Sequence, residues 1–356
     1  MSILIVKPAI RSVLQSLAFI AGFLLFGCSD SGNSDVPNVS SMSIYEFDGS
    51  TMGTTYHIKV VLPSNAKSLE NIGKGVDKAL NDVDMSMSTY KKTSELSRFN
   101  QSPIDSWFPV SEDTMRVVKL AQSISAKSKG QYDTTVGPLV NLWGFGPMAR
   151  PEVIPDQDQI LALKQKVGYE KLAFREDPPA LRKSADIYVD LSSVAKGYAV
   201  DKVAEFLEAS SAPDYLVEVG GEIRAAGHKP GGAPWVLAIE SPASESRSVF
   251  RKIKVTGIGL ATSGDYRNYY EEAGVRFSHT IDPFTGRPIQ HKLASVSVIA
   301  KTCAEADALA TALLVMGEER GYEFALSNNI AAYFIYRTSD GFQGKSSNGF
   351  EQYLIH

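Results

Sequence analysis

The sequence predicts an α+β fold built from helices and largely antiparallel strands. Apolar residues recur at helical spacing mainly in the first 209 residues, whereas strand-like runs dominate the chain after them. The two kinds of element therefore segregate along the chain and do not alternate as repeated strand–helix–strand units. We find no internal repeat and no clean linker in the expected folded part, so one domain is expected over residues 44–356.

Composition places the chain among ordinary globular proteins. Its 356 residues include 36 Lys and Arg, 40 Asp and Glu, 44% hydrophobic and 21% charged residues, and the formal net charge is −4. These values exclude a disordered tail protein, a polytopic membrane protein and a strongly basic nucleic-acid binder. The two cysteines, Cys28 and Cys303, lie in different contexts, so we expect no disulfide and a buried Cys303 thiol.

Residues 1–27 have the layout of a bacterial secretory signal peptide. Lys7 and Arg11 precede the short apolar run 17–26, and residues 25–28 resemble the processing site of a bacterial lipoprotein. A spanning helix needs about 20 apolar residues, so a permanent transmembrane segment is the weaker alternative. We expect Cys28 to carry the lipid and the polar residues 28–43 to form a flexible tether. The alternative is that Cys28 is a buried core residue.

Four segments are expected to be helical. Apolar residues recur at helical spacing over 69–83 and 117–124. A third helix is expected over 193–209, because the run Asp190-Leu-Ser-Ser is typical of a helix start. The fourth, 303–316, is expected to end at Gly317, because glycine is the usual residue in the left-handed conformation that closes helices.

Strands are expected over most of the chain after residue 209. These runs are rich in Val, Ile and aromatic residues, and two of them flank Ala273-Gly274 as in a hairpin. The expected strands are 215–223, 235–240, 250–260, 293–300 and 330–336, and the expected hairpin strands are 266–271 and 275–281.

The sharpest candidate for chemistry is an oxygen pair within the expected helix 303–316. Asp307 and Thr311 are four residues apart, so they share one helix face. Such oxygen ligands suit Mg²⁺, which completes its coordination with water and substrate phosphate. A capped helix start, with a threonine bonded back to its own backbone, is the alternative explanation.

Asp190 and Lys196 mark a candidate anion site. An expected strand ends at Asp190, and the first turn of the following helix holds Lys196. Free N–H groups at a helix N-terminus, beside a cation, attract an anion. Plain capping by Asp190 or Ser192, with Lys196 in solvent, is the alternative. Neither glycine-rich phosphate motif, GxGxxG or GxxxxGK[ST], occurs, so a nucleotide would need a less common architecture.

His279 and two glycine-rich segments complete the candidates. His279 lies in an expected strand that leads directly into the turn 282–286, and a histidine suits proton transfer at neutral pH. A lone histidine is also common as a structural residue. Segments 49–54 and 130–146 contain glycines that permit close backbone approach, and Trp143 and Phe145 offer flat apolar surface to an aromatic ring. Ordinary turns packed on a core are the alternative.

Together these segments resemble the FAD:protein FMN transferase family, the ApbE-type flavin transferases. Eight stretches match in one order between residues 50 and 317, nearly the whole expected domain. They are STMGTTYHI, TYKKTSELSRFN, GQYDTTVGPLVNLWGFGP, YVDLSSVAKGYAVD, YLVEVGGEI, LATSGDYRNYY, SHTIDPFTGRPI and AEADALATALLVMG. The resemblance implies an α+β fold with FAD in a cleft between two intimate sub-lobes, and a flavin transferase catalytic domain over residues 44–356.

The resemblance also implies roles for matching residues. His279 would be the catalytic base, and Asp307 and Thr311 would ligate Mg²⁺, with Ser193 contributing through its main-chain oxygen. The residues that would line the FAD site are Met52, Tyr90, Gln131, Tyr132, Asp133, Asp190, Lys196 and Ile281.

Two positions depart from the family pattern. Some members carry another carboxylate three residues after the equivalent of Asp307, where this chain has Ala310. If that group is a ligand elsewhere, water would fill its place here. Some members also have a carboxylate in place of Lys196, so the contact of Lys196 with FAD stays open.

The implied reaction transfers FMN from FAD to a Ser or Thr hydroxyl of another protein and releases AMP. The family's acceptor pattern, an Asp followed three residues later by Ser/Thr-Gly-Ala-Ser/Thr, is absent here, so the acceptor is expected to be a separate exported protein, such as a membrane redox-pump subunit. We expect no nucleic-acid partner. The alternatives are an FAD pyrophosphatase that gives FMN and AMP, and a non-catalytic flavin-binding lipoprotein. The expected location is the periplasmic side of a bacterial membrane, lipid-anchored, with the inner membrane preferred over the outer.

Overall fold

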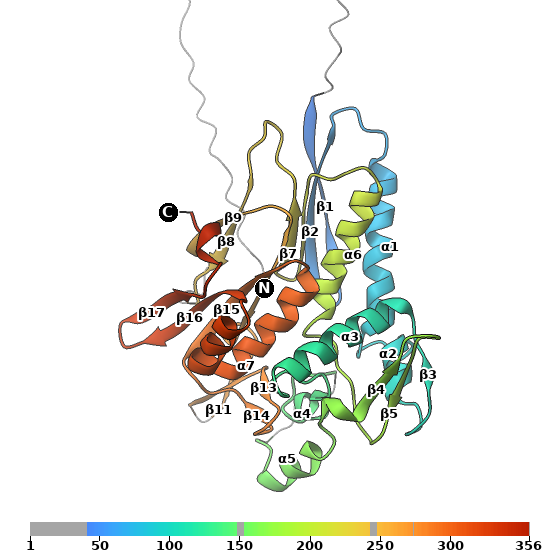
Figure 1. The fold of residues 1–356 in the computed structure, drawn as a ribbon, viewed down its shortest axis with the longest axis vertical. Coiled ribbons are helices and arrows are strands. Elements are labelled where there is room, and N and C mark those ends of the chain that lie inside the picture. The colour runs from blue at the N-terminus through green and yellow to red at the C-terminus, as the bar shows by residue number, and fades with distance from the viewer. Residues whose placement is uncertain (1–40, 148–152, 243–247, 273, 356) are drawn as a thin grey trace, which may run out of the picture.

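The computed structural model describes residues 41–147, 153–242, 248–272 and 274–355. The predicted signal segment, Cys28 and the predicted tether up to residue 40 lie outside the described residues. Within the described ranges, no helix has both the length and the apolar character needed to cross a bilayer. The predicted α+β class is confirmed, because helices pack on a sheet whose strands are antiparallel (Figure 1).

An eight-stranded sheet forms the centre of the described chain. Its order is β1-β2-β6-β7-β10-β15-β16-β17, and each neighbouring pair is antiparallel. Side chains alternate between the two faces of such strands, so the sheet can bury both. The strands are β1 (Met42–Thr51), β2 (Thr54–Pro63), β6 (Tyr215–Val219), β7 (Glu222–Ala226), β10 (Ile258–Gly264), β15 (Leu293–Ala300), β16 (Ala331–Thr338) and β17 (Gly341–Ser346).

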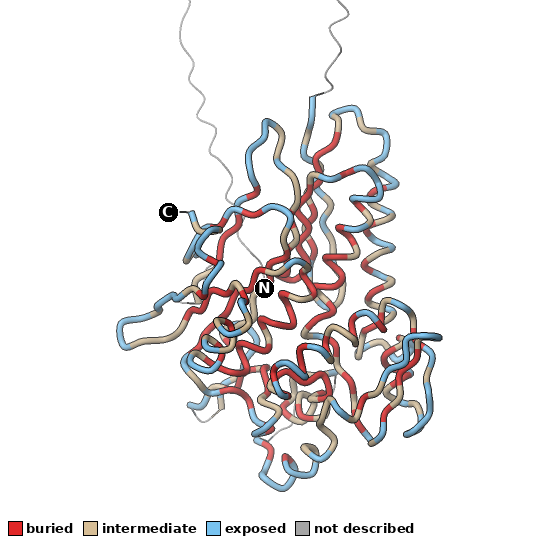
Figure 2. Tube along the Cα trace, in the orientation of Figure 1, coloured by how far each residue is buried: buried red, intermediate tan, exposed pale blue. Residues whose placement is uncertain are grey.

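Helices cover one face of this sheet and form the larger core. Ile58 and Val60 of β2 are fully buried in it, together with Val203 and Leu313 from two of the helices. Each such side chain contributes about 1.5–3 kcal/mol when it leaves water. Figure 2 shows the buried residues concentrated where helices and sheet meet. The helices are α1 (Leu69–Met87), α3 (Glu112–Lys127), α6 (Ala195–Ala209) and α7 (Cys303–Ser327).

A separate hairpin covers the other face of the sheet. Strands β8 (Trp235–Glu240) and β9 (Val249–Val255) pair with each other and bury Trp235 and Ile253 in a second core. Phe350, next to the short 3₁₀ turn Glu351–Tyr353, is also fully buried there. The two cores explain why both faces of the central strands are apolar.

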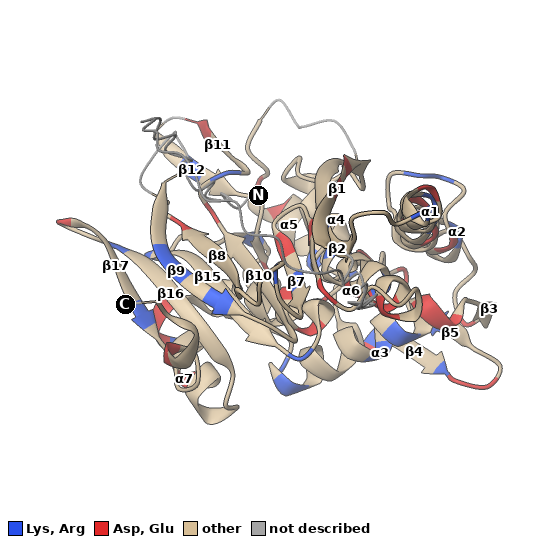
Figure 3. Ribbon diagram, turned by 90° about the horizontal axis from the view of Figure 1, so that it is seen from above, with Lys and Arg blue, Asp and Glu red and all other residues tan. Residues whose placement is uncertain are grey.

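Smaller elements gather beside α3 and α7, and some of them carry a third core. Trp143 stacks on Phe277 with ring centroids 5.4 Å apart, and Ile281 packs in the same cluster. The smaller elements are α2 (Glu95–Asn100), β3 (Phe108–Pro109), α4 (Gly137–Leu142), α5 (Gln157–Lys164), a 3₁₀ turn (Tyr169–Lys171), β4 (Leu172–Arg175), β5 (Ala180–Lys183), β11 (Tyr269–Glu272), β12 (Val275–Ser278), β13 (Ile281–Asp282) and β14 (Arg287–Pro288). Buried residues of α2, β4 and β5 belong to the larger core. Basic and acidic residues are interspersed over the elements (Figure 3).

Two expected strands are each divided by glycine. The run 215–223 is a hairpin, because Gly220 and Gly221 have φ of 62° and 105° and turn the chain between β6 and β7. The run 250–260 is divided at Gly257, where φ is 66°, so β9 pairs with β8 while β10 joins the central sheet. Both predictions were wrong in the same way, since two short strands were taken as one.

The helix predictions differ from the structure only at their ends. Helix α6 begins at Ala195 instead of residue 193. Gly317 leaves the helical conformation with φ 81°, as predicted, but helical backbone resumes after it and continues to Ser327. Thr302 caps the N-terminus of this helix, because its side-chain oxygen accepts a hydrogen bond from the Glu305 N–H at 3.2 Å. Cys303 is a buried free thiol, as predicted.

Candidate active site

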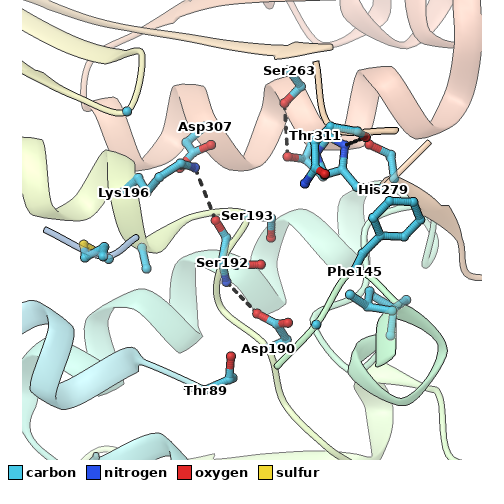
Figure 4. A pocket seen from close by; sticks show the side chains of 18 of the residues that line it. Thr89, Phe145, Asp190, Ser192, Ser193, Lys196, Ser263, His279, Asp307 and Thr311 are labelled. Atoms are coloured by element: carbon cyan, nitrogen blue, oxygen red, sulfur yellow. Dashed lines mark hydrogen bonds and ion pairs between the residues drawn. The ribbon is translucent and has the colours of Figure 1, made fainter. Parts of the chain in front are cut away.

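The predicted site residues lie around one cavity of about 820 Å³, a volume typical of a small-molecule site. Figure 4 shows side chains from α7, from the loop before α6 and from the segment that holds His279 meeting around it. The cavity is lined by all twelve predicted residues in the described chain: Met52, Tyr90, Gln131, Tyr132, Asp133, Asp190, Ser193, Lys196, His279, Ile281, Asp307 and Thr311.

Hydrogen bonds join two loops that line the cavity, residues 132–134 and 190–193. The Asp190 N–H donates to the Thr134 carbonyl at 2.7 Å, and the Tyr132 hydroxyl lies 2.9 Å from Ser193 Oγ. The Asp190 carboxylate accepts from the Ser192 N–H at 2.8 Å, which fixes the turn before α6. These contacts explain why the motifs around Tyr132 and Asp190, which are far apart in the sequence, lie side by side in the lining of the cavity.

The Asp133 carboxylate shapes its own loop. Its Oδ1 accepts from the N–H and the hydroxyl of Thr135, both at 2.7 Å, and its Oδ2 accepts from the Tyr169 N–H at 2.9 Å. Burial raises the pKa of Asp133, although these three bonds oppose the rise. A ligand that contacts the carboxylate would have to compete with them, so contact with FAD stays a prediction.

Asp307 is buried and holds the N-terminus of α6. Its Oδ2 accepts from the Gly197 N–H at 3.0 Å, whereas an uninterrupted helix would direct that N–H to the Ser193 carbonyl. The Ser193 carbonyl consequently receives no backbone hydrogen bond within the described residues. A Cβ at Gly197 would lie 2.4 Å from the Cys303 carbonyl oxygen, so only glycine permits this helix crossing.

Asp201 organises the same crossing and was not predicted from the sequence. Its two carboxylate oxygens accept from the N–H groups of Cys303 and Ala304, each at 2.9 Å, and Arg224 lies 3.1 Å from it. Free N–H groups at a helix start are stabilised by a carboxylate. Asp201 therefore fixes the start of α7, which carries Asp307.

Lys196 does not extend into solvent. Its ammonium lies 3.4 Å from Glu222, 3.9 Å from Asp307 and 3.5 Å from the Ser192 carbonyl oxygen. Burial alone would lower the pKa of Lys196, but the two carboxylates reverse this and raise it. Burial raises the pKa values of Asp307 and Glu222, while Lys196 opposes both rises. The solvated-lysine alternative is wrong, and Glu222 joins the site unpredicted.

The oxygen atoms near Asp307 fit Mg²⁺. Asp307 Oδ1 has no hydrogen-bond partner in the described chain, the Ser193 carbonyl is likewise available, and Thr311 Oγ1 lies 3.2 Å from Ser263 Oγ. The described residues contain no group of three His, Cys, Asp or Glu side chains placed for a metal. Mg²⁺ needs no such group, because water and substrate phosphate supply most of its ligands. One carboxylate oxygen, one carbonyl and one hydroxyl are sufficient protein ligands.

His279 has the tautomer of a base. Its Nδ1 lies 3.0 Å from the Asn268 carbonyl oxygen, and since a carbonyl only accepts hydrogen bonds, Nδ1 carries the proton. The lone pair is then on Nε2 of this partly buried ring. Phe145 contacts the ring edge-on, with centroids 6.3 Å apart. Burial lowers the pKa of His279, which keeps Nε2 unprotonated at neutral pH.

Several other lining residues were not predicted. Arg267 forms an ion pair with Glu240, and Lys91 pairs with Asp84 at 2.7 Å. Arg267 and Asn268 belong to the stretch LATSGDYRNYY, so their motif was recognised but not their place in the cavity. The same holds for Lys91, in TYKKTSELSRFN, and for Glu222, in YLVEVGGEI, whereas Asp84 lies outside the matching stretches. The unpredicted lining residues with polar side chains include Asp84, Lys91, Glu222, Thr262, Ser263, Arg267 and Asn268.

The fold and the cavity define an α+β protein in which a histidine and several side-chain oxygen atoms line one cavity large enough for a nucleotide. The chain belongs to the ApbE family, whose model matches residues 52–334. This confirms the resemblance inferred from the eight stretches.

Sequence alignments with known FAD:protein FMN transferases extend over most of the chain. An FAD:protein FMN transferase of Vibrio cholerae is 47% identical over 306 residues, which is 86% of this chain and 91% of the relative. One from Escherichia coli K12 is 41% identical over 344 residues, 95% of this chain and 97% of the relative.

Solved structures confirm the fold. The flavin transferase ApbE from Vibrio cholerae superposes with a TM-score of 0.82 at 45% identity, over 88% of this chain and 100% of that one. The apo form of the flavinyl transferase ApbE from Pseudomonas stutzeri superposes with a TM-score of 0.81 at 39% identity. The match covers 89% of this chain and 98% of that one.

Proposed function

We propose that this protein transfers FMN from FAD to a Ser or Thr hydroxyl of an exported acceptor protein and releases AMP. Membership of the ApbE family and the activity for which the relatives are named support the transfer of FMN from FAD to protein. The observation that carries the proposal is that His279, with Nε2 unprotonated, lines the same cavity as the oxygen atoms of Asp307 and Thr311.

The acceptor hydroxyl would attack the phosphorus of the FMN half of FAD. The new bond joins that phosphorus to the hydroxyl oxygen, and the bond to the AMP phosphate breaks, so AMP leaves with the bridging oxygen. His279 Nε2 takes the hydroxyl proton, because a neutral hydroxyl is a poor nucleophile. The ring is already held by Asn268, so little reorganisation is needed.

Protein groups would orient FAD around this centre. Asp307, Thr311 and the Ser193 carbonyl would hold Mg²⁺, which when bound neutralises charge on the pyrophosphate. Lys196 and Asp190 border the same space, where Asp190 would position the nucleotide. Phe145 covers one side of His279 with apolar surface and limits the access of water.

The test is to incubate the protein with FAD and Mg²⁺, with and without an acceptor that contains Asp-x-x-Ser/Thr-Gly-Ala-Ser/Thr. We expect AMP only with acceptor, together with a flavin-fluorescent acceptor band. AMP release without acceptor, and no labelled band, would show a pyrophosphatase instead. Intact FAD under all conditions would show a binding protein. Either result would overturn the proposal.

We also propose that lipid on Cys28 anchors the protein at the periplasmic side of the inner membrane, with residues 28–43 as a tether and residues 44–356 as the catalytic domain. Support comes from the basic segment, the apolar run and the processing site described above. An exported acceptor protein would then be within reach of the domain.

A further inference from the structure

Glu222 is a buried carboxylate of the cavity with one unused oxygen. It is the first residue of β7 and lies directly opposite Val219 of β6. Cross-strand partners share a face of the sheet, and Val219 packs in the helix-side core. Glu222 is only 3% exposed, and its Oε2 has no hydrogen-bond partner within the described residues. A buried, unpaired carboxylate oxygen is costly, so its presence calls for an explanation.

The explanation lies in the ammonium of Lys196. This group is nearer to Glu222, at 3.4 Å, than to Asp307, at 3.9 Å. The Gly220 turn holds the lysine stem in place, since a Cβ on Gly220 would lie 3.2 Å from Lys196 Cδ. One ammonium therefore stands between two buried carboxylates. Without the charge of Glu222, Asp307 would be its remaining carboxylate partner.

We propose that Glu222 is a positioning residue: it draws the Lys196 ammonium away from Asp307 and so leaves the Asp307 carboxylate available to Mg²⁺. This inference rests on the magnesium site of the proposed function. Lys196 and a divalent cation compete for the same carboxylate, because both are attracted to its negative charge. Glu222 shifts that competition toward the metal without touching it.

The variant Glu222→Gln keeps the size of the side chain and removes its charge. Lys196 then pairs with Asp307, and we expect Mn²⁺, used as the probe, to bind about 10- to 100-fold more weakly, the range found for groups that support metal ligands. The double variant Glu222→Gln/Lys196→Met removes the competitor, so its Mn²⁺ affinity should return toward that of the wild type.

Glu218→Gln is the matched control. Glu218 lies on the same hairpin opposite Ile223, whose side chain packs in the core on the other face of the sheet, and its Oε1 accepts from the Gly221 N–H at 2.6 Å. A glutamine oxygen can still accept that bond. We expect this variant to bind Mn²⁺ as the wild type does.

Electron paramagnetic resonance would report free Mn²⁺ during titration of the full chain with saturating FAD and no acceptor, against a blank of FAD alone. Wild-type affinity in Glu222→Gln, or a double variant as weak as the single one, would overturn the inference. The proposed magnesium site would survive that result as long as the wild type binds Mn²⁺ more tightly than the blank. A wild type that binds no more Mn²⁺ than the blank would overturn both.

Discussion

Replacing Gly197 by alanine tests the crossing of α6 and α7 on which the site depends. The added methyl group would lie 2.4 Å from the carbonyl oxygen of Cys303 and 2.8 Å from the Cα of Ala304. Ordinary contact begins near 3.4 Å, so the helices must separate by 3.4 − 2.4 = 1.0 Å. Both obstacles are backbone atoms, which cannot rotate aside as a side chain would.

The cost follows from three contributions. Overpacking costs about 1–3 kcal/mol, and the weakened hydrogen bond from the Gly197 N–H to Asp307 costs about 1.5–3 kcal/mol because its acceptor is charged and buried. Alanine recovers about 1 kcal/mol through its higher helix propensity. The net loss in the free energy of unfolding is therefore about 1.5–5 kcal/mol.

Gly73→Ala is the control, because Gly73 also lies inside a helix, α1, but a Cβ there meets only Phe47 at an ordinary 3.5 Å. Urea unfolding followed by circular dichroism should show Gly197→Ala less stable than the wild type and Gly73→Ala more stable by about 1 kcal/mol. Gly197→Ala should also bind Mn²⁺ more weakly, since Asp307 moves. Equal stabilisation by both substitutions would refute the proposed packing.

Four further predictions concern chemistry and location. His279→Ala should bind FAD but transfer FMN at least about 100-fold more slowly, the usual contribution of a positioned base; an unchanged rate would remove its role. In the wild type the rate should fall on acidification with a midpoint below 6.5, because burial lowers the pKa of His279 from that value and only the unprotonated ring accepts a proton. Asp307→Ala should lose Mn²⁺ binding whereas Glu305→Ala, on the same helix, keeps it; retained binding in both would contradict the ligand assignment. Cys28→Ser should move the protein from the membrane to the soluble fraction, and continued membrane association would contradict the lipid anchor.

The motifs were predictable because each combines local backbone chemistry with a functional side chain. Asp307 and Thr311 share a face on any helix, and the turn at Asp190 follows from its own side chain. The matching stretches placed His279 and Tyr132 in one site through family resemblance, and the structure brings all of these residues to one cavity.

Glu222 and Asp201 were not predictable by the same reasoning. Glu222 contacts Lys196, which is 26 positions away on another element. Asp201 binds the N–H groups of Cys303 and Ala304, which are 102 and 103 positions away. Such contacts depend on the packing of α6 against β7 and α7, which local patterns do not encode. The strand boundaries at Gly220 and Gly257 were missed because an apolar run looks the same whether it is one strand or two joined by a tight turn.

The most direct test of the central claim is mass spectrometry of the acceptor protein after incubation with FAD, Mg²⁺ and the wild-type chain. The account predicts one esterified FMN on a Ser or Thr of the acceptor, with one AMP released for each acceptor modified, and far less of this product with His279→Ala in the same time. An acceptor of unchanged mass in the presence of FMN and AMP, or a modified acceptor formed equally well by His279→Ala, would contradict it.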